Sequence, residues 1–216
     1  MKIDELGKII KDRRSIRKWK EDDVPDDLLT KAIELASWAP NGHNFQGWYF
    51  IVVKDQGIKE KMGQAVQSVI DNIASWPEAG NWRAQMDRSQ KMASNFVKAP
   101  ACVAVFVSKY QSHFDKILAL RKKSDDATLK MRGYRKFAPT SIQSVSAAVT
   151  IMLLAFHTMG LGAVWMVAPL LAKEKIESIL KPPPETDLVC MVAVGYPDEI
   201  RKSGRKPVEK VLEFIS

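Results

Sequence analysis

The spacing of hydrophobic residues changes along the chain and separates predicted helices from predicted strands. Segments with apolar residues three or four positions apart are predicted to be helices: residues 4–12, 24–39, 57–75, 84–98 and 172–180. Short, almost wholly apolar runs are predicted to be buried strands: residues 47–54, 101–107, 163–168 and 188–197. Strands and helices do not alternate regularly, which favours an α+β fold over a doubly wound sheet.

One stretch, residues 137–172, has no Asp, Glu, Lys or Arg and is long enough to span a bilayer. Polar side chains are scattered through its first part, and Gly160, Gly162 and Pro169 interrupt its second part. We therefore expect a buried helix at about 141–159, a glycine turn and a core strand rather than a membrane span.

Two segments lack a clear pattern. Residues 76–82 are predicted to be a loop, and residues 110–139 are mixed and basic, with 123–139 resembling a mobile excursion. The chain has no repeat and no linker that would divide its 216 residues. We expect one domain over residues 1–216, with a variable excursion at about 76–139.

The net charge of +8 suits an anionic partner such as a phosphorylated small molecule, a nucleic acid or a membrane surface. It fits a generally basic, soluble surface equally well. Cys102 and Cys190 lie in apolar runs, which predicts buried strand positions in a reducing compartment. The N-terminus has acidic residues where a signal peptide needs an apolar run, so we expect a cytoplasmic protein.

Side chains offer little material for catalysis. The glycines of "GLGAVW" at 160–165 do not form a dinucleotide fingerprint, and the chain has only three histidines. His157 falls in the apolar helix, where a hydrogen-bonded core histidine is expected. No metal site is predicted, so an enzyme of this sequence would depend on an organic cofactor.

Two basic motifs lie near opposite ends of the chain. In "RRSIR", an extended backbone would direct Arg13, Ser15 and Arg17 to one side, where they could grip a phosphate. A solvated basic stripe explains the same residues. Arg205, in "RKP", matters only if the tail folds back towards this motif.

The stretch "APNGHNFQGWYFIVV" at 39–53 places several amide side chains between a helix end and a strand. Amide groups both donate and accept hydrogen bonds, as the edge of a uracil-like ring requires. A helix cap followed by a turn is the alternative explanation.

Taken together, these motifs resemble the nitroreductase family of flavin enzymes. "RRSIR", the "VPDDLL" helix, "APNGHNFQ" and "WYF" follow one another in the family's order and spacing. "GLGAVWMVAP" and "RKPVEKVL" are similar to its later blocks. The resemblance covers about residues 7–55 and 144–212.

The resemblance implies an α+β fold with a central, mainly antiparallel sheet flanked by helices, and an intertwined homodimer that binds FMN at its interface. The cofactor-binding residues that it implies are Arg13, Arg14, Ser15, Arg17, Pro40, Asn41, Asn44, Gln46, Val167, Ala168 and Arg205. Arg13 and Arg205 would hold the phosphate, and Arg17 would lie near the pyrimidine edge. A backbone N–H at Val167 or Ala168 would face flavin N5, and the polar block at 40–46 would come from the partner subunit.

Some positions depart from the family pattern. Thr150 and Ile151 stand where many members have a Gln-Asn pair, and His43 stands where a small hydroxyl residue is common. His43 would point either to solvent or to the cofactor. Aromatic residues of the 76–139 segment could shape the substrate pocket or serve only in packing: Trp76, Trp82, Tyr110 and Tyr134.

The implied function is hydride transfer from NADH or NADPH, through FMN, to a nitroaromatic, a quinone or another small electron-poor aromatic acceptor. Dehalogenation or enone reduction on the same fold is the alternative. A basic nucleic-acid-binding protein is the alternative from another class, although most tryptophans lie outside the Lys/Arg clusters.

Overall fold

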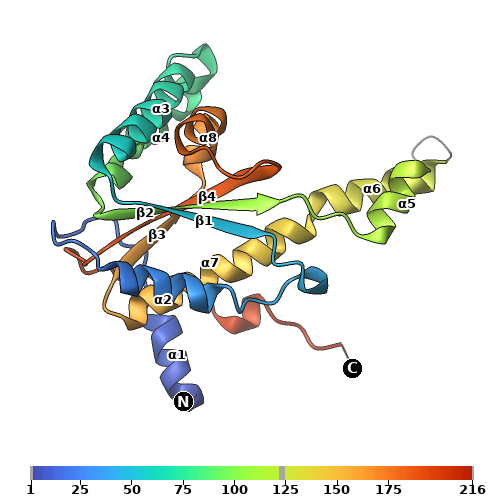
Figure 1. Cartoon of the computed structure of the whole chain (residues 1–216), viewed down its shortest axis with the longest axis horizontal. Coiled ribbons are helices and arrows are strands. Elements are labelled where there is room, and N and C mark those ends of the chain that lie inside the picture. Colours follow the sequence, from blue (N-terminus) through green and yellow to red (C-terminus); the bar gives the residue numbers. More distant parts are fainter. Residues whose placement is uncertain (1, 122–124, 216) are drawn as a thin grey trace.

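The computed structural model describes residues 2–121 and 125–215 and places a four-stranded sheet between two groups of helices (Figure 1). The strands are β1 (Trp48–Val53), β2 (Ala101–Ser108), β3 (Gly162–Met166) and β4 (Thr186–Gly195). Their order in the sheet is β1-β2-β4-β3, and all three neighbouring pairs are antiparallel. The α+β class and the antiparallel sheet expected from the sequence are therefore confirmed.

Helices cover both faces of the sheet. Their bounds in the described residues are α1 (Ile3–Asp12), α2 (Asp26–Ala36), α3 (Gln56–Ala74), α4 (Arg83–Met92), α5 (His113–Leu120), α6 (Asp126–Phe137), α7 (Thr140–Thr158) and α8 (Lys173–Leu180). In Figure 1, α2 and α7 lie on one side of the sheet and α3, α4 and α8 on the other. α1 and the α5–α6 pair project from this body.

The two central strands are buried on both faces. Neighbouring side chains of a strand point to opposite faces, so Val103 and Val105 pack towards α2 and α7, whereas Ala104 and Phe106 pack towards α3 and α8. This two-sided burial explains why residues 101–107 form a continuous apolar run. Cys102 in β2 and Cys190 in β4 are free and buried, as predicted, and burial raises the pKa of both thiols to about 12.

α7 is the buried helix expected within the charge-free run. Its buried side chains face the sheet and α2: Val145, Ala148, Val149, Met152, Leu153, Ala155 and Phe156. Residues 126–158, which include α6, are long and apolar enough to cross a membrane by length and composition, a test that core helices also pass. In the most apolar window of this stretch 22% of the residues are buried, and the buried side chains of α7 pack against the sheet and α2.

Two predicted boundaries were wrong. The strand predicted over 163–168 ends at Met166, because Ala168–Ala172 form a short 3-10 turn with Pro169, which lacks an N–H. The helix predicted over 84–98 ends at Met92. The Asn95 side chain, beyond that end, donates to the backbone oxygen of Arg17 at 2.8 Å, a distant contact that no local pattern reveals.

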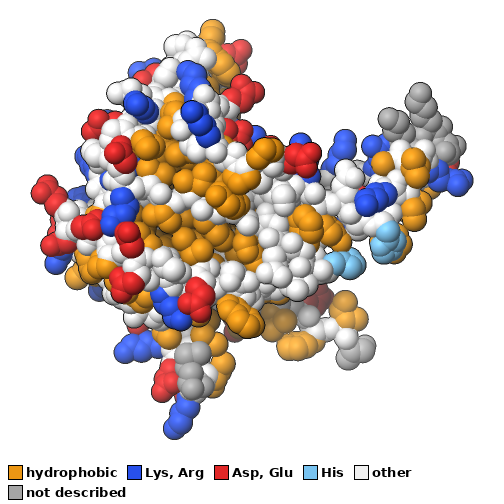
Figure 2. Space-filling model, in the orientation of Figure 1, with side chains coloured by type: hydrophobic (Ala, Val, Ile, Leu, Met, Phe, Trp, Pro, Cys, Tyr) orange, Lys and Arg blue, Asp and Glu red, His pale blue; other side chains and the backbone are white. Residues whose placement is uncertain are grey.

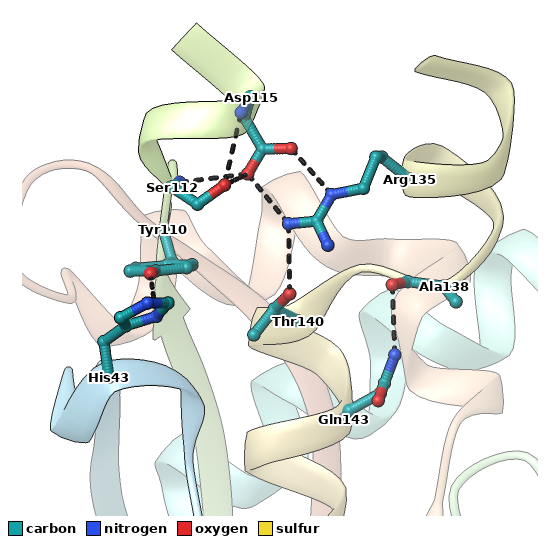
Figure 3. Close-up of polar contacts among 8 residues, drawn as sticks. All are labelled: His43, Tyr110, Ser112, Asp115, Arg135, Ala138, Thr140 and Gln143. Atoms are coloured by element: carbon teal, nitrogen blue, oxygen red, sulfur yellow. Dashed lines mark hydrogen bonds and ion pairs between the residues drawn. The ribbon is translucent and has the colours of Figure 1, made fainter. Parts of the chain in front are cut away.

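The segment that resembled an excursion without clear structure is largely helical. α5 and α6 form an arm that leaves the body after β2 and returns at α7 (Figure 1); residues 122–124 lie outside the described residues. At its base, the Asp115 carboxylate accepts from Arg135 at 2.8 and 3.0 Å and from the Ser112 hydroxyl at 2.7 Å (Figure 3). Ser112 caps α5 in return, so one carboxylate joins the start of α5 to the end of α6.

Asp115→Asn is expected to loosen this arm. Hydrogen bonds from Arg135 hold the pKa of Asp115 well below its usual range; burial opposes them and Ser112 reinforces them. Because charged hydrogen bonds contribute about 1.5–3 kcal/mol each, we expect hydrogen–deuterium exchange across residues 113–137 to accelerate about tenfold.

The matched control is Asp126→Asn, an exposed carboxylate on the same arm, which should change exchange much less. The Asp115 pKa is lower in the folded protein, so its stabilisation is present above the unfolded pKa of about 4 and is lost as pH falls through the folded value. Equal exchange in the Asp115→Asn variant and wild type at neutral pH would contradict this role.

Candidate functional site

The "RRSIR" motif lies along the edge of the sheet beside β3. Ser15 forms an isolated parallel bridge with Ala163, and the Ile16 backbone N–H donates to the Ala163 oxygen at 3.1 Å. Ile16 is buried, so alternation along this extended segment directs Arg13, Ser15 and Arg17 away from the core. The extended backbone predicted for this motif is therefore present.

Gly162 permits the close approach of this segment to β3. A Cβ at this position would lie 2.8–2.9 Å from three side-chain carbons of Ile16. The Trp19 indole N–H also donates to the Gly162 oxygen at 2.8 Å, which anchors the segment beyond Arg17.

We expect Gly162→Ala to displace the arginine segment and to lower the free energy of unfolding by about 1–3 kcal/mol, as overpacking does. Gly133→Ala, in α6, is the control, because a Cβ there would meet no atom within 4 Å. Urea unfolding of both variants checks the prediction. A Gly162→Ala protein as stable as the control would show that Ile16 moves aside freely.

The C-terminal tail folds back onto the arginine motif, which is the condition that the sequence left open. An Arg14 guanidinium nitrogen donates to the Ser203 backbone oxygen at 3.3 Å. Burial lowers the pKa of Arg13, and the nearby charges of Arg205 and Arg14 lower it further. Like charges from both ends of the chain thus converge where an anion would relieve their repulsion.

A cavity of about 300 Å³ lies beside these groups, lined by Arg13, Arg14 and Arg201 and by the carboxylates Asp12 and Glu199. We call it the cationic cavity because its arginines outnumber its carboxylates. The Arg14 Nε is buried and has no hydrogen-bond partner among the described residues. Arginines outnumber carboxylates around the cavity, and a phosphate accepts several charged hydrogen bonds at once. The lining is therefore compatible with an anion, and the assignment of the FMN phosphate to these arginines stays a prediction.

Arg17 is held from both sides of its own backbone. Its N–H donates to Glu199 Oε1 at 2.5 Å, and its oxygen accepts from Asn95 at 2.8 Å. Burial lowers the pKa of the Arg17 guanidinium, as do Arg201 and Arg88, whereas Glu199 raises it. The Arg17 backbone is thus fixed, and its positive charge is only partly offset by Glu199.

The Arg17 side chain lines a second cavity of about 390 Å³. Val167 and Ala168, the predicted positions for a backbone donor, line the same cavity from the end of β3. The opposite wall comes from α3 and α4, with Ile70, Ile73, Met86, Ser89 and Met92. Arg13, with Arg205 near it, therefore lies at the cationic cavity, and Arg17 lies at a second, mainly apolar cavity.

The polar block before β1 lies elsewhere in the chain. β1 and β3 are at opposite edges of the sheet, so Pro40, Asn41, Asn44 and Gln46 do not join the arginine group within one chain. Asn41 Oδ1 accepts from the Gln46 N–H at 2.9 Å, and Gln46 Nε2 donates to Asn44 Oδ1 at 3.1 Å. These amides build a turn, as the cap-and-turn alternative predicted.

Three residues of this turn have left-handed backbones, with φ of 54°, 53° and 50° at His43, Asn44 and Gln46. Such conformations are costly away from glycine and concentrate at functional sites. The His43 ring is exposed, and its Nδ1 lies 2.5 Å from the Tyr110 hydroxyl, at the base of the α5–α6 arm (Figure 3). Neither predicted orientation of His43 included this contact.

Some residues lie elsewhere than the sequence predicted. His157 is half-buried and lines the cationic cavity beside Arg13, rather than lying in the core as predicted; burial lowers its pKa, Asp12 raises it and Arg13 lowers it. The 390 Å³ cavity is lined by none of the four aromatic residues Trp76, Trp82, Tyr110 and Tyr134. Trp76, Trp82 and Tyr134 are exposed.

Residues that the sequence analysis missed lie around Arg17: Trp19, Asn95, Glu199 and the apolar wall of α3 and α4. Glu199 follows the last strand, in "GYPDE". For Met86 and Met92 the sequence carries no signal, because methionines at helical spacing usually indicate a core.

Two kinds of known protein are similar to this chain in sequence. The chain is 24% identical over 208 residues to an iodotyrosine deiodinase of Hydra vulgaris, covering 93% of this chain and 69% of that protein. It is 28% identical over 192 residues to a putative NADH dehydrogenase/NAD(P)H nitroreductase of Methanothermobacter thermautotrophicus, covering 88% and 76%.

Two solved structures share the fold over almost the whole chain. A BluB-like flavoprotein from Clostridium difficile 630 has a TM-score of 0.85 and 27% identity, with complete coverage of both chains. A nitroreductase with bound FMN from Desulfitobacterium hafniense has a TM-score of 0.73 and 19% identity, covering 98% of each chain. The Nitroreductase family model matches residues 10–196. Because this match covers most of the chain, the chain belongs to the Nitroreductase family.

Proposed function

We propose that this chain is an FMN-dependent oxidoreductase that takes hydride from NADH or NADPH and passes it to nitroaromatic or quinone acceptors. The convergence of Arg13 and Arg205 beside β3, next to the cavity that Arg17 lines, carries the proposal. When bound, FMN would accept a hydride from the nicotinamide and pass two electrons to the acceptor, as in quinone + NADH + H⁺ → hydroquinone + NAD⁺.

The residues of the site have distinct roles in this proposal. Arg13, Ser15 and Arg205 bind the phosphate, whose nearly two negative charges neutralise the converging guanidinium groups. Arg17 places its positive charge at the electron-accepting ring, where it favours the reduced form. The backbone at Val167 and Ala168 supplies donors that do not depend on side-chain identity.

The proposal includes an intertwined homodimer in the cytoplasm. The polar block at 40–46 reaches the arginine group only if a second copy supplies it. Figure 2 shows apolar side chains gathered across one face, between α3 and α2 and over β1. Large apolar side chains are also exposed on α1, on the arm and in the tail: Ile3, Ile10, Phe114, Leu120, Phe137, Phe214 and Ile215. A second copy would cover such surface.

A second candidate activity is reductive dehalogenation, which the similarity to iodotyrosine deiodinases favours. The same two electrons, with a proton, would replace iodine by hydrogen on an aromatic ring and release iodide, as in Ar–I + NADH → Ar–H + I⁻ + NAD⁺. The binding roles of Arg13, Arg17 and Arg205 would be unchanged.

Purified protein is expected to be yellow and to release FMN on denaturation. Anaerobic turnover should then be measured with NADH and NADPH against a nitrobenzoate, a benzoquinone, an enone and an iodophenol. Oxidation of nicotinamide that requires a nitroaromatic or quinone would support the first candidate, and iodide release the second. A colourless protein that takes up no added FMN would disprove both.

A further inference from the structure

The Glu199 side chain lies against the backbone of the segment that carries Arg17. Its Oε1 accepts hydrogen bonds from the backbone N–H groups of Arg17 and Lys18 at 2.5 and 3.2 Å. The Arg201 guanidinium donates to its Oε2 at 2.9 Å. Both carboxylate oxygens are therefore engaged, and they join a segment near the start of the chain to one near its end.

The Glu199 carboxylate is negatively charged at neutral pH. Its side chain is 14% exposed, and burial alone would raise its pKa. The hydrogen bonds from the Arg17 N–H and from Arg201 outweigh burial, so the pKa of Glu199 lies below its usual value. Because most of the side chain is shielded from water, this charge acts on neighbouring groups more strongly than a surface charge would.

Glu199 offsets part of the positive charge that Arg17 brings to its cavity. The Arg17 side chain lines the 390 Å³ cavity, whereas Glu199 does not line it and meets Arg17 at the backbone N–H. Burial lowers the pKa of Arg17, and the charges of Arg201 and Arg88 also lower it. Glu199 is the charge that raises it. A carboxylate outside the cavity therefore moderates the cation inside it.

Asn95 holds the same backbone from its other side. Its Nδ2 donates to the Arg17 oxygen at 2.8 Å. Asn95 begins a short 3-10 helix, Asn95–Lys98, and just beyond that helix the buried Lys59 ammonium of α3 donates to the Ala99 oxygen at 2.6 Å. Asn95 is uncharged, so its hydrogen bond fixes where Arg17 lies without changing the charge around it.

We propose that Glu199 and Asn95 are positioning residues for Arg17, and that the Glu199 charge lowers the reduction potential of bound FMN. The inference rests on the proposed function, in which the Arg17 charge lies at the electron-accepting ring. Two-electron reduction, FMN + 2e⁻ + H⁺ → FMNH⁻, adds a negative charge to the ring, and a nearby cation stabilises that charge. A carboxylate that offsets this cation makes reduced FMN a stronger electron donor.

The midpoint potential of FMN bound to the protein, measured by anaerobic reduction against a reference dye, tests the inference. Glu199→Gln keeps an oxygen that can accept from the two backbone N–H groups and removes the negative charge. We expect reduced FMN to be bound about tenfold more tightly relative to oxidised FMN than in wild type, which raises the midpoint potential by about 30 mV for two electrons. Glu185→Gln is the control, because it removes the same charge from an exposed position before the other end of β4 and should leave the potential unchanged.

Asn95→Ala separates positioning from charge. It releases one hold on the Arg17 backbone and leaves every charge in place, so the guanidinium spends less time at the ring. We expect the opposite shift, with reduced FMN bound about threefold less tightly relative to oxidised FMN. A purely structural role of Glu199 would shift the potential of both variants in the same direction or not at all.

Two results would overturn the inference: an unchanged or lower potential in Glu199→Gln, and an unchanged or higher potential in Asn95→Ala. The second still decides if the Glu199→Gln protein does not fold. An upward shift in Glu185→Gln as large as that in Glu199→Gln would also count against the inference, because any lost carboxylate would then have the same effect. A wild-type protein that holds no FMN would refute the proposed function instead.

Discussion

Arg13→Ala is expected to weaken FMN binding by about 100-fold or more. The Arg13 guanidinium lies beside Arg205 and lines the cationic cavity, so it can give a phosphate two charged hydrogen bonds. Such bonds contribute about 1.5–3 kcal/mol each, and 2.7 kcal/mol corresponds to the 100-fold loss. Titration of the apo-protein with FMN, followed by fluorescence, measures the effect.

Two further variants make the result specific. Arg205→Ala should weaken binding in the same direction, whereas Arg132→Ala, in the α6 part of the arm, should bind FMN like wild type. Loss of Arg13 also removes repulsion between like charges, so the apo-protein should not lose thermal stability. Unchanged FMN affinity in both Arg13→Ala and Arg205→Ala would remove the phosphate assignment.

Leu29→Ala is expected to lower the free energy of unfolding by about 2–5 kcal/mol. Leu29 is 2% exposed on α2, where it packs among the side chains that α2, α7 and the sheet bury together. Removing three carbons there leaves a cavity that the surrounding strands cannot fill by moving.

Leu35→Ala on the same helix is the matched control, because Leu35 is 39% exposed and its loss should cost about 1 kcal/mol or less. Urea unfolding of the apo-proteins at one protein concentration compares the two. Similar midpoints for Leu29→Ala and Leu35→Ala would mean that α2 is not part of the stabilising core.

The sheet could be predicted because its central strands are buried on both faces. A strand buried on both faces needs apolar side chains at every position, as residues 101–107 and 188–194 have. The helix predicted over 24–39 was recognisable because a proline lies near each end. The return of the tail to the arginine motif could be expected only from a family resemblance that joined "RRSIR" to "RKP", which are far apart in sequence. The phosphate-binding role of these arginines stays a prediction.

The arm and the apolar cavity wall could not be predicted. α5 and α6 are held by Asp115 and Arg135, which are 20 positions apart, a contact without a local periodic signal. Met86 and Met92 form a wall only because α4 packs beside α3 and faces the end of β3. The contact that His43 makes could not be predicted either, because its partner Tyr110 is 67 positions away.

The return of the tail to the arginine segment sets an order of events during synthesis. Arg14 and Ser203 are 189 positions apart, and Glu199, which fixes Arg17, is also made late. A ribosome adding about 5–20 residues per second needs roughly ten to forty seconds between the two halves of this site. The helices that cover the sheet are therefore synthesised before the residues that complete the proposed phosphate site. Nascent chains stalled before residue 199 should remain colourless in the presence of FMN.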